Sequence, residues 1–396
     1  MKIKLGVFFG GESVEHEVSI ISAIQAINFL DKEKYDVIPI YIARDNCFYV
    51  GEKIGIIEEY KDIQALLNKS QKVILVYEKE KVKLMKYPLK KFANNLYNYI
   101  DIAFPIVHGT NVEDGVLQGY LKTFKLPFVG CDVTASAVGM DKYIMKTILK
   151  DNQIPVLDCE VFNDKQYIEG LENILNKTQS KLEYPVIVKP INLGSSVGIK
   201  IAKNREELKE AVEYSFQFAK KILIEKAITH LREINCSVLG DYEEAVASEC
   251  EEPISTDEIL SYEDKYIAGD SGTKGMSSLK RKLPAELEEE TKKQIQELAI
   301  KTFQVLGCNG VARIDLMIDT KENKIYVNEI NTIPGSLSFY LWQATGLGYT
   351  ELLDKMIDLA LKRNREEQEL NYSFETSILS NITLGGVKGN KQQTKI

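Results

Sequence analysis

The side chains best suited to metal chemistry lie on two apolar segments near the C-terminal end, VARIDLMID (311–319) and KIYVNEIN (324–331). Alternate residues of a strand share a face, so Arg313 and Asp315 point one way, and Glu329 and Asn331 also share a face. The short connection predicts an antiparallel hairpin that brings these faces together. Two carboxylates and an amide oxygen suit Mg²⁺, which normally shares substrate phosphate oxygens. The same alternation also fits a solvated strand face that carries an ion pair.

A second group of residues could bind phosphate. The segment PVIVKP (185–190) places Lys189 at the end of an apolar strand, and NLGSSVG (192–198) follows at once. Glycines and small hydroxyl residues allow backbone N–H groups to curl around an anion, while the lysine supplies a point charge. The loop lacks the Gly-Lys-Ser/Thr of a Walker A motif. Taken alone, a tight hairpin explains it better than a phosphate site.

Two further segments end apolar strands in the first 115 residues. GGESVEHE (10–17) opens a helix, where a Gly pair permits close backbone approach and free N–H groups favour an anion. Ser13 as a helix cap, with Glu15 and Glu17 complementing the helix dipole, is the alternative reading. FPIVHG (104–109) places His108 at a strand end, where ligands bind in open α/β sheets, although a core histidine would look the same.

The elements that position these residues fall into three predicted domains and a tail. Apolar runs at 4–9, 37–42, 72–77 and 100–107, with a helix-like stretch at 19–30, predict a mostly parallel sheet in residues 1–130, elaborated by an exposed Lys- and Glu-rich part at 44–99. Residues 131–229 read as a small α+β domain that contains two strands, PVIVKP and KILIEKAI (221–228). Residues 230–365 carry a helix at 285–306 and the hairpin, and the polar tail 366–396 is expected to be partly disordered.

Composition narrows the class of protein. The 396 residues are 44% hydrophobic and 27% charged, as in folded soluble proteins, and the net charge of -8 argues against a nucleic-acid partner. The apolar run near the N-terminus is too short for the core of a signal peptide, and no apolar stretch is long enough to span a membrane. We therefore expect a cytoplasmic protein without membrane contact. Six cysteines without CxxC spacing predict reduced, structural thiols rather than a zinc site.

Six motifs together resemble the D-alanine–D-alanine ligase family, in order and in spacing. They are GGESVEHEVS, PIVHGTNVEDG, VGMDKYIMK, PVIVKPINLGSSVG, the RID of VARIDLMID, and NEINTIPG, and the resemblance runs from about residue 3 to 362. It implies an ATP-grasp fold of class α/β (α+β), with three domains and ATP held between two antiparallel sheets. It implies ATP-dependent ligation of two D-alanines, through a D-alanyl phosphate, to D-alanyl-D-alanine for peptidoglycan precursors.

The resemblance also implies residue roles and partners. Phosphate lysines would be Lys142 and Lys189, two Mg²⁺ ions (Mn²⁺ as a possible substitute) would be bound, and a homodimer is the family expectation. The remaining implied positions are these: Ser195 and Ser196 with the phosphates; Glu225, Lys226, Ala227 and Glu233 with adenine and ribose; Asp315, Glu329 and Asn331 with the metals; Glu15, Ser195, Tyr266, Arg313 and Gly335 in catalysis; and Glu15, His108, Lys265, Tyr340 and Leu341 with the amino acids.

The sequence departs from the family pattern after NEINTIPG. Tyr340 stands where relatives carry a serine that helps to bind the carboxylate of the second substrate, which leaves the second amino acid open, with D-serine as one candidate. The loop at 269–282 is longer and more basic than usual. Another ATP-grasp ligase and a catalytically inactive nucleotide-binding homologue are the alternatives. Biotin carboxylases and purine-synthesis ligases would not carry the GGESVEHEVS start.

Overall fold

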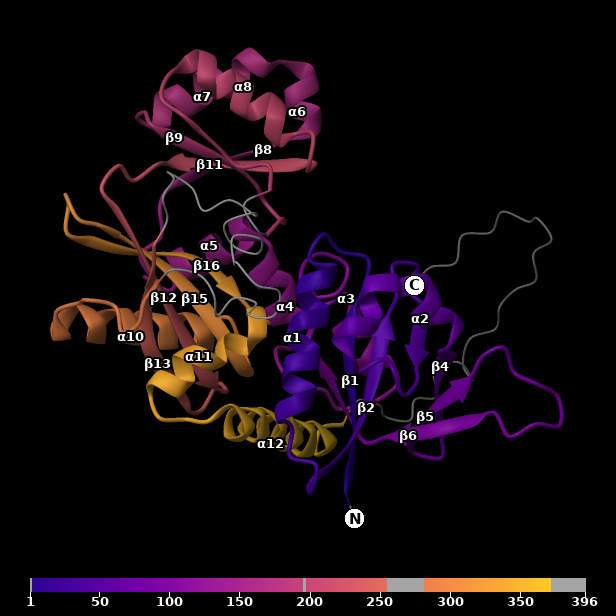
Figure 1. The fold of residues 1–396 in the computed structure, drawn as a ribbon. Helices are drawn as coiled ribbons and strands as arrows, with labels where there is room; N and C mark the ends of the chain where they lie inside the picture. Colours follow the sequence, from indigo (N-terminus) through magenta and orange to yellow (C-terminus); the bar gives the residue numbers. More distant parts are fainter. Residues whose placement is uncertain (1, 195–196, 255–280, 372–396) are drawn as a thin grey trace, which may run out of the picture.

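The computed structural model describes residues 2–194, 197–254 and 281–371. Its three sheets form three bodies around one central space: the first sheet on the right of Figure 1, the small second sheet at the top, and the third sheet at the left. The predicted positions Ser195, Ser196, Lys265 and Tyr266 lie outside the described residues, as does most of the polar tail.

The first sheet is mixed rather than mostly parallel. Its order is β6-β5-β4-β3-β2-β1-β7, and only β2, β1 and β7 run parallel. The neighbours from β2 to β6 pair antiparallel. Lys79 and Glu80 alone join β4 to β5, both at positive φ as in a tight hairpin turn, and a connection of two residues is too short for the crossover that parallel pairing needs. The strands are β1 (Ile3–Gly10), β2 (Tyr35–Ile42), β3 (Phe48–Val50), β4 (Gln71–Glu78), β5 (Lys81–Lys86), β6 (Leu96–Ile100) and β7 (Ile102–Pro105).

Helices from both ends of the chain pack on this sheet. Among them, α12 (Tyr349–Gln368) contributes Leu352, Leu353, Met356 and Ile357 to the core of the first sheet, so the chain returns to the body where it began. Figure 1 shows α12 running beneath α1. The other elements here are α1 (His16–Phe29), η1 (Ile57–Asp62), α2 (Ile63–Asn68) and α3 (Val116–Thr123).

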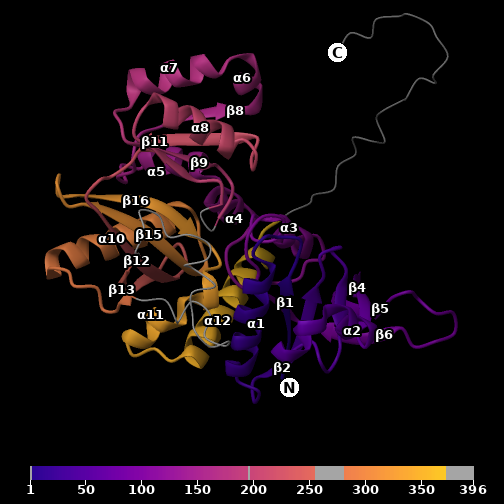
Figure 2. The ribbon, with the colours of Figure 1, turned by 45° about the horizontal axis from the view of Figure 1, so that its top comes forward.

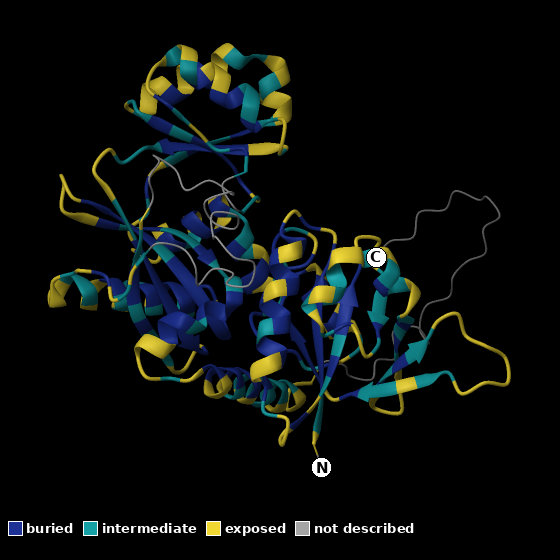
Figure 3. Cartoon of the chain, in the orientation of Figure 1, coloured by how far each residue is buried: buried dark blue, intermediate teal, exposed yellow. Residues whose placement is uncertain are grey.

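The second sheet is small and antiparallel, with the order β10-β9-β11-β8. Helices α6, α7 and α8 cover its outer face, where exposed residues gather on the side away from the strands (Figures 2 and 3). Along β11 the side chains alternate, so Ile222 and Ile224 enter the core under the helices while Glu225 faces the other way. The bounds are β8 (Cys159–Asn163), α6 (Asp164–Glu169), α7 (Leu171–Lys181), β9 (Val186–Pro190), β10 (Lys200–Ala202), α8 (Arg205–Ser215) and β11 (Lys221–Lys226).

The third sheet is antiparallel, with the order β14-β13-β12-β15-β16. Its core contains Met145 and Leu149 of α5 together with Ile295 and Phe303 of α10. The segment at 131–154 therefore packs on the third sheet, although the next strand in sequence belongs to the second sheet. The predicted domain division at 130, 229 and 365 remains a proposal. The bounds are α4 (Val133–Met140), α5 (Lys142–Asp151), β12 (Leu231–Gly240), β13 (Ala245–Pro253), β14 (Arg281–Lys282), α10 (Glu289–Val305), β15 (Gly310–Asp319), β16 (Lys324–Asn331), η3 (Gly335–Ser338) and α11 (Phe339–Ala344).

All six cysteines are free thiols and four of them are buried, in agreement with the predicted structural role. Within the described ranges, none of the helices is both long enough and apolar enough to cross a membrane.

Candidate active site

One pocket lies where the three bodies meet. The pocket-facing side of the second sheet forms what we call the roof, the pocket-facing side of the third sheet forms the floor, and the first sheet closes one end. Side chains from each body line it, including Glu15, His108, Lys189, Glu225, Arg313 and Glu329. Residues that are hundreds of positions apart in the chain therefore face the same space.

The floor carries a row of polar side chains set by strand register. Glu251 of β13 pairs with Asn235 of β12, Asn235 also pairs with Asp315 of β15, and Asp315 pairs with Glu329 of β16. Residues directly opposite each other share one face of a sheet, so these four side chains cross the floor side by side. We call them the floor row: Glu251, Asn235, Asp315 and Glu329.

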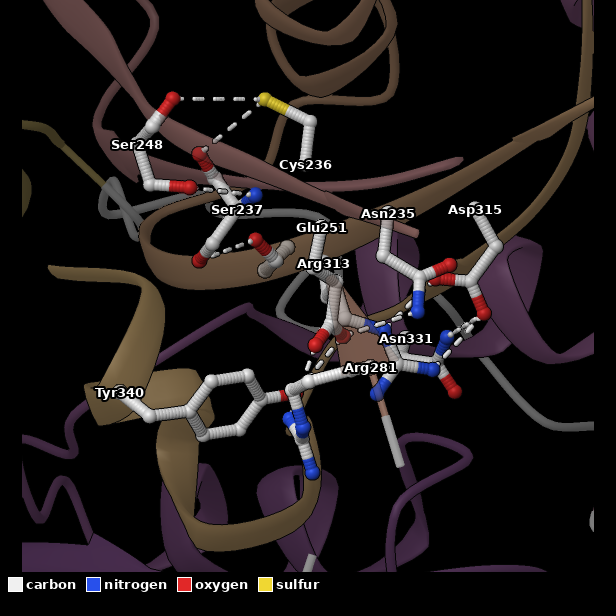
Figure 4. A network of polar contacts seen from close by, with 11 residues as sticks. Asn235, Cys236, Ser237, Ser248, Glu251, Arg281, Arg313, Asp315, Asn331 and Tyr340 are labelled. Carbon is white, nitrogen blue, oxygen red and sulfur yellow. Dashed lines mark hydrogen bonds and ion pairs between the residues drawn. The ribbon is translucent and has the colours of Figure 1, made fainter. Parts of the chain in front are cut away.

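Each carboxylate of the floor row has its own cation. Arg313 donates to Asp315 through Nε and Nη2, at 2.6 and 2.7 Å. Arg281 donates to Glu251 at 2.8 Å, and Lys142 lies 3.3 Å from Glu329. Figure 4 shows Arg313 beside Asp315 and Asn331, and Arg281 beside Glu251. The predicted hairpin is present, with Arg313 opposite Asn331 and Asp315 opposite Glu329.

The end of the row at Asp315 and Glu329 fits a divalent cation. Like charges placed directly opposite in a sheet repel, so this pair of carboxylates is stabilised by positive charge between them. Asn331 donates its amide N–H to Asp315 at 3.0 Å, which orients it toward the same point. In the described part of the chain no three acidic, His or Cys side chains cluster as a closed metal cage. Mg²⁺ seldom uses such a cage and completes its shell with phosphate oxygens and water.

The roof concentrates cations on one buried carboxylate. Glu225 is 1% exposed, and its two oxygens lie 2.8 Å from Lys146 Nζ and 2.5 Å from Lys189 Nζ. Burial raises the pKa of Glu225, but the two lysines outweigh that effect and lower it to about 2. Lys189 also donates to Asn328 on the floor at 3.2 Å, so it spans the pocket. Two lysines on one carboxylate leave a surplus positive charge suited to a phosphate chain.

Lys142 owes its position to a helix cap. Asp141 accepts hydrogen bonds from the backbone N–H groups of Tyr143 and Ile144, which starts α5 at Lys142. The Lys142 ammonium group then donates to the Leu193 carbonyl at 2.9 Å, in the glycine-rich loop, while it faces Glu329. The motif GMDK therefore aims a cation between that loop and the floor row.

The predicted adenine and ribose positions all line the pocket. The backbone N–H of Ala227 donates to the Pro185 carbonyl at 2.9 Å, and the Lys226 ammonium group donates to Glu322 at 3.4 Å. Glu233 lies on β12 opposite Met317 of β15. The Glu225 carboxylate is occupied by Lys146 and Lys189.

Glu15 and His108 meet at the end closed by the first sheet. Glu15 precedes α1 and makes no side-chain cap bond, and Ser13 accepts from Glu15 N–H instead of capping the helix. A Cβ on Gly109 would lie 2.9 Å from the Glu15 carboxylate, and one on Gly194 3.3 Å from it. These glycines let the backbone approach the acid closely. Burial lowers the pKa of His108, which keeps the ring neutral near pH 7.

Glu113 and Ser22, for which the sequence predicted no role, organise this end of the pocket. Glu113 accepts from the backbone N–H groups of Gly109 and Ile333 at 2.9 and 3.1 Å, and thereby joins the first body to the segment after β16. Burial, with Glu15 nearby, raises the pKa of Glu113 to about 8. Ser22 Oγ bonds both His108 Nε2 and the Ser336 N–H, each at 3.0 Å. The acidic run after His108 was a visible signal for Glu113, whereas nothing marked Ser22.

A left-handed turn follows Gly335, which lines the pocket. Ser336, Leu337 and Ser338 have φ values of 50°, 53° and 50°, a region that costs L-residues roughly 1–2 kcal/mol each. Such strain persists where the surroundings fix it, and here the Ser336 N–H is held by Ser22. The turn carries the backbone of Gly335 into the pocket and starts α11.

Tyr340 and Leu341 lie behind the pocket wall. The Tyr340 hydroxyl donates to Glu251 at 2.9 Å, and Leu341 is fully buried in a small cluster with Tyr340, Phe339 and Leu283. Neither side chain lines the pocket, whereas Glu251 and Arg281 do. Tyr340 was predicted to contact the substrate directly, but it reaches the pocket only through Glu251.

Two antiparallel sheets that face each other across a pocket of lysines and carboxylates, with an α/β body closing one end, define an ATP-grasp enzyme of the ligase class. The family models described as D-ala D-ala ligase N-terminus and C-terminus match residues 4–131 and 148–358. The chain therefore belongs to the D-alanine–D-alanine ligase family, which confirms both the predicted fold class and the resemblance carried by the six motifs.

Individual relatives agree along nearly the whole chain. A D-alanine--D-alanine ligase from Thermosipho melanesiensis is 40% identical over 377 residues, covering 95% of this chain and 98% of the relative. The solved D-alanine-D-alanine ligase from Coxiella burnetii has a TM-score of 0.77 and 32% identity, covering 93% and 96%. The solved VanG D-Ala:D-Ser ligase from Enterococcus faecalis has a TM-score of 0.76 and 30% identity, covering 91% and 100%.

Proposed function

We propose that the protein ligates two D-alanines with ATP to give D-alanyl-D-alanine, ADP and phosphate. The observation that carries the proposal is the division of charge across the pocket: surplus lysine charge on the roof, and a carboxylate pair at one end of the floor row. ATP would lie between the two sheets with its phosphates against Lys189 and Lys142. Family membership also supports a cytoplasmic homodimer as a working hypothesis.

Two amino-acid sites would adjoin the phosphate end. Glu15, a buried carboxylate at the end closed by the first sheet, would bind the ammonium group of the first D-alanine. Neutral His108 would lie beside the carboxylate of that D-alanine without adding charge, its ring fixed by Ser22. That carboxylate attacks the γ-phosphate, which breaks the bond to ADP and forms a D-alanyl phosphate.

The second step forms the peptide bond. The unprotonated amine of the second D-alanine attacks the acyl carbon and expels phosphate. Arg313, fixed in two bonds to Asp315, and the Gly335 N–H would donate to the oxyanion of the tetrahedral intermediate, where preformed donors act most strongly. Asp315, Glu329 and Asn331 would hold Mg²⁺, which neutralises phosphate charge during such transfers.

A D-serine acceptor is the second candidate. It is favoured by Tyr340, which stands where a serine was expected, and by the similarity to a solved D-Ala:D-Ser ligase.

The test is to incubate the protein with ATP, Mg²⁺ and single D- or L-amino acids and their pairs, and to identify products by mass. D-Alanyl-D-alanine formed with D-alanine alone is the expected result. A preference for mixed D-alanyl-D-serine in the paired incubation would select the second candidate. Absence of any dipeptide with every amino acid would overturn the proposal.

A further inference from the structure

A second charged cluster occupies the end of the floor row that the proposed chemistry does not use. Glu251 accepts from Arg281 Nη1 at 2.8 Å through one oxygen, and from Tyr340 and Asn235 at 2.9 and 3.0 Å through the other. The Arg281 guanidinium group also stacks over the Tyr340 ring, 4.1 Å from its centroid. Figure 4 shows the four side chains converging.

Stability alone does not account for this cluster. The side chains of Glu251 and Arg281 are 3% and 11% exposed. A buried ion pair loses so much hydration that it contributes little net stability compared with apolar packing. Yet Glu251, Arg281 and Asn235 all line the pocket, while Tyr340 backs them from outside it. A buried, hydrogen-bonded charged cluster that lines a pocket is better explained by ligand binding than by a contribution to the stability of the fold.

The place of the cluster in the row identifies that ligand. In the proposed ligation the phosphates lie at Asp315 and Glu329, which are opposite each other on β15 and β16, and the reacting carbon lies at Arg313, which binds Asp315. Glu251 lies two strands from Asp315, on the side away from Glu329, and neighbouring strands are about 4.8 Å apart. An amino acid whose amine attacks near Arg313 would therefore extend its carboxylate toward Arg281. A guanidinium group with five N–H donors can serve two carboxylates at once.

We propose that Arg281 binds the α-carboxylate of the second amino acid, an inference that rests on the proposed ligase function. Tyr340 is a positioning residue: its ring supports the guanidinium group and its hydroxyl fixes Glu251. The arginine then takes over the role expected of a serine at position 340. The site for the second amino acid then has a charged hydrogen-bond donor instead of a neutral hydroxyl group. It should therefore select second substrates that carry a carboxylate.

The test compares acceptors with and without that carboxylate. Wild type, Arg281→Met and Arg281→Lys are assayed with D-alanine as donor and either D-alanine or D-alaninamide as acceptor. The Met variant should raise the KM for the second D-alanine at least about tenfold, which corresponds to one lost charged contact. The KM values for ATP and for the first D-alanine should stay within about twofold. Wild type should prefer D-alanine over the amide, and the Met variant should lose most of that preference.

The matched control is Arg232→Met. Arg232 pairs with the next glutamate, Glu252, at 2.9 Å on the same sheet, but its side chain is 33% exposed and does not line the pocket. Its KM values and acceptor preference should match those of wild type. Tyr340→Phe keeps the ring under Arg281 and should shift the acceptor preference less than Arg281→Met does.

Failure of the two proposals can be told apart. A wild type that forms no dipeptide overturns the ligase function. A wild type that ligates, together with an Arg281→Met protein whose acceptor preference is unchanged, overturns only the role of Arg281. If the Arg281→Met protein melts at a much lower temperature than wild type, the folded Arg281→Lys protein decides in its place. Lysine keeps the charge but loses the planar fork of donors, so its KM for the second D-alanine should rise and its preference for D-alanine over the amide should fall. A wild-type KM and preference in Arg281→Lys would then overturn the role of Arg281.

Discussion

The roof and the floor of the pocket manage buried charge in opposite ways. On the roof, two lysines converge on the single carboxylate of Glu225. On the floor, each carboxylate of the floor row has a cation of its own. The roof therefore carries a positive surplus that suits phosphates, whereas the floor is balanced and suits a further cation only where Asp315 and Glu329 lie opposite each other. The two sides therefore suit ligands of opposite charge.

Glu329→Gln tests the floor most severely. The change removes one full charge at the position where the floor would hold Mg²⁺, and an amide cannot replace it. We expect turnover to fall at least about 10³-fold, equivalent to roughly 4 kcal/mol of transition-state stabilisation. Dipeptide formation at saturating ATP and D-alanine measures the effect. Glu252→Gln is the control, since Glu252 pairs with Arg232 outside the pocket and its loss should change turnover by less than about twofold. Near wild-type turnover in Glu329→Gln would remove Glu329 from the metal site.

Glu225→Gln tests the roof through stability. Without the carboxylate, Lys146 and Lys189 are left buried with no negative partner between them. The expected loss in unfolding free energy is about 3–5 kcal/mol, measured by urea unfolding without ATP. Glu160→Gln is matched to it: Glu160 also pairs with two lysines, at 2.8 and 2.5 Å, on the same sheet, but the lysine side chains are about half exposed. Its loss should cost no more than about 1 kcal/mol.

The same carboxylate gives a pH dependence whose sign is fixed. The pKa of Glu225 falls from 4.5 to about 2 on folding, so its stabilisation is complete above pH 4.5 and is lost as the pH drops toward 2. Unfolding free energies between pH 6 and 3 should therefore converge for wild type and Glu225→Gln. Two parallel curves over that range would show that the lysines do not depend on this acid.

Lys189→Ala separates the roof from the amino-acid sites. Removing the lysine that spans the pocket should raise the KM for ATP about 10- to 100-fold, while the KM values for D-alanine stay within about twofold. Lys221→Ala is the control, because Lys221 lies on the same sheet with its side chain exposed to solvent. An ATP dependence equal to that of wild type would mean that the glycine-rich loop is only a hairpin.

Much of the site could be predicted from the sequence because its parts are local. Alternation along 311–319 and 324–331, with a short connection, was enough to predict the hairpin that sets Asp315 opposite Glu329. The cap residue Asp141 next to Lys142 and the glycines next to Lys189 are also readable, since turn and cap chemistry act over a few residues. The order of six such motifs sufficed for the family and its fold.

The tertiary structure alone decided which charges meet. Lys146 lies one turn after Lys142, yet only the packing of α5 under the roof brings it to Glu225, 79 positions later. Glu251 and Arg281 carry no motif, and they join the floor row because the register of β13 on β12 sets Glu251 beside Asn235. The four antiparallel neighbours in the first sheet were missed because the apolar pattern of a strand does not reveal the direction of its partner. Local spacing fixes how a side chain is presented, whereas strand register and burial determine its partner and its charge.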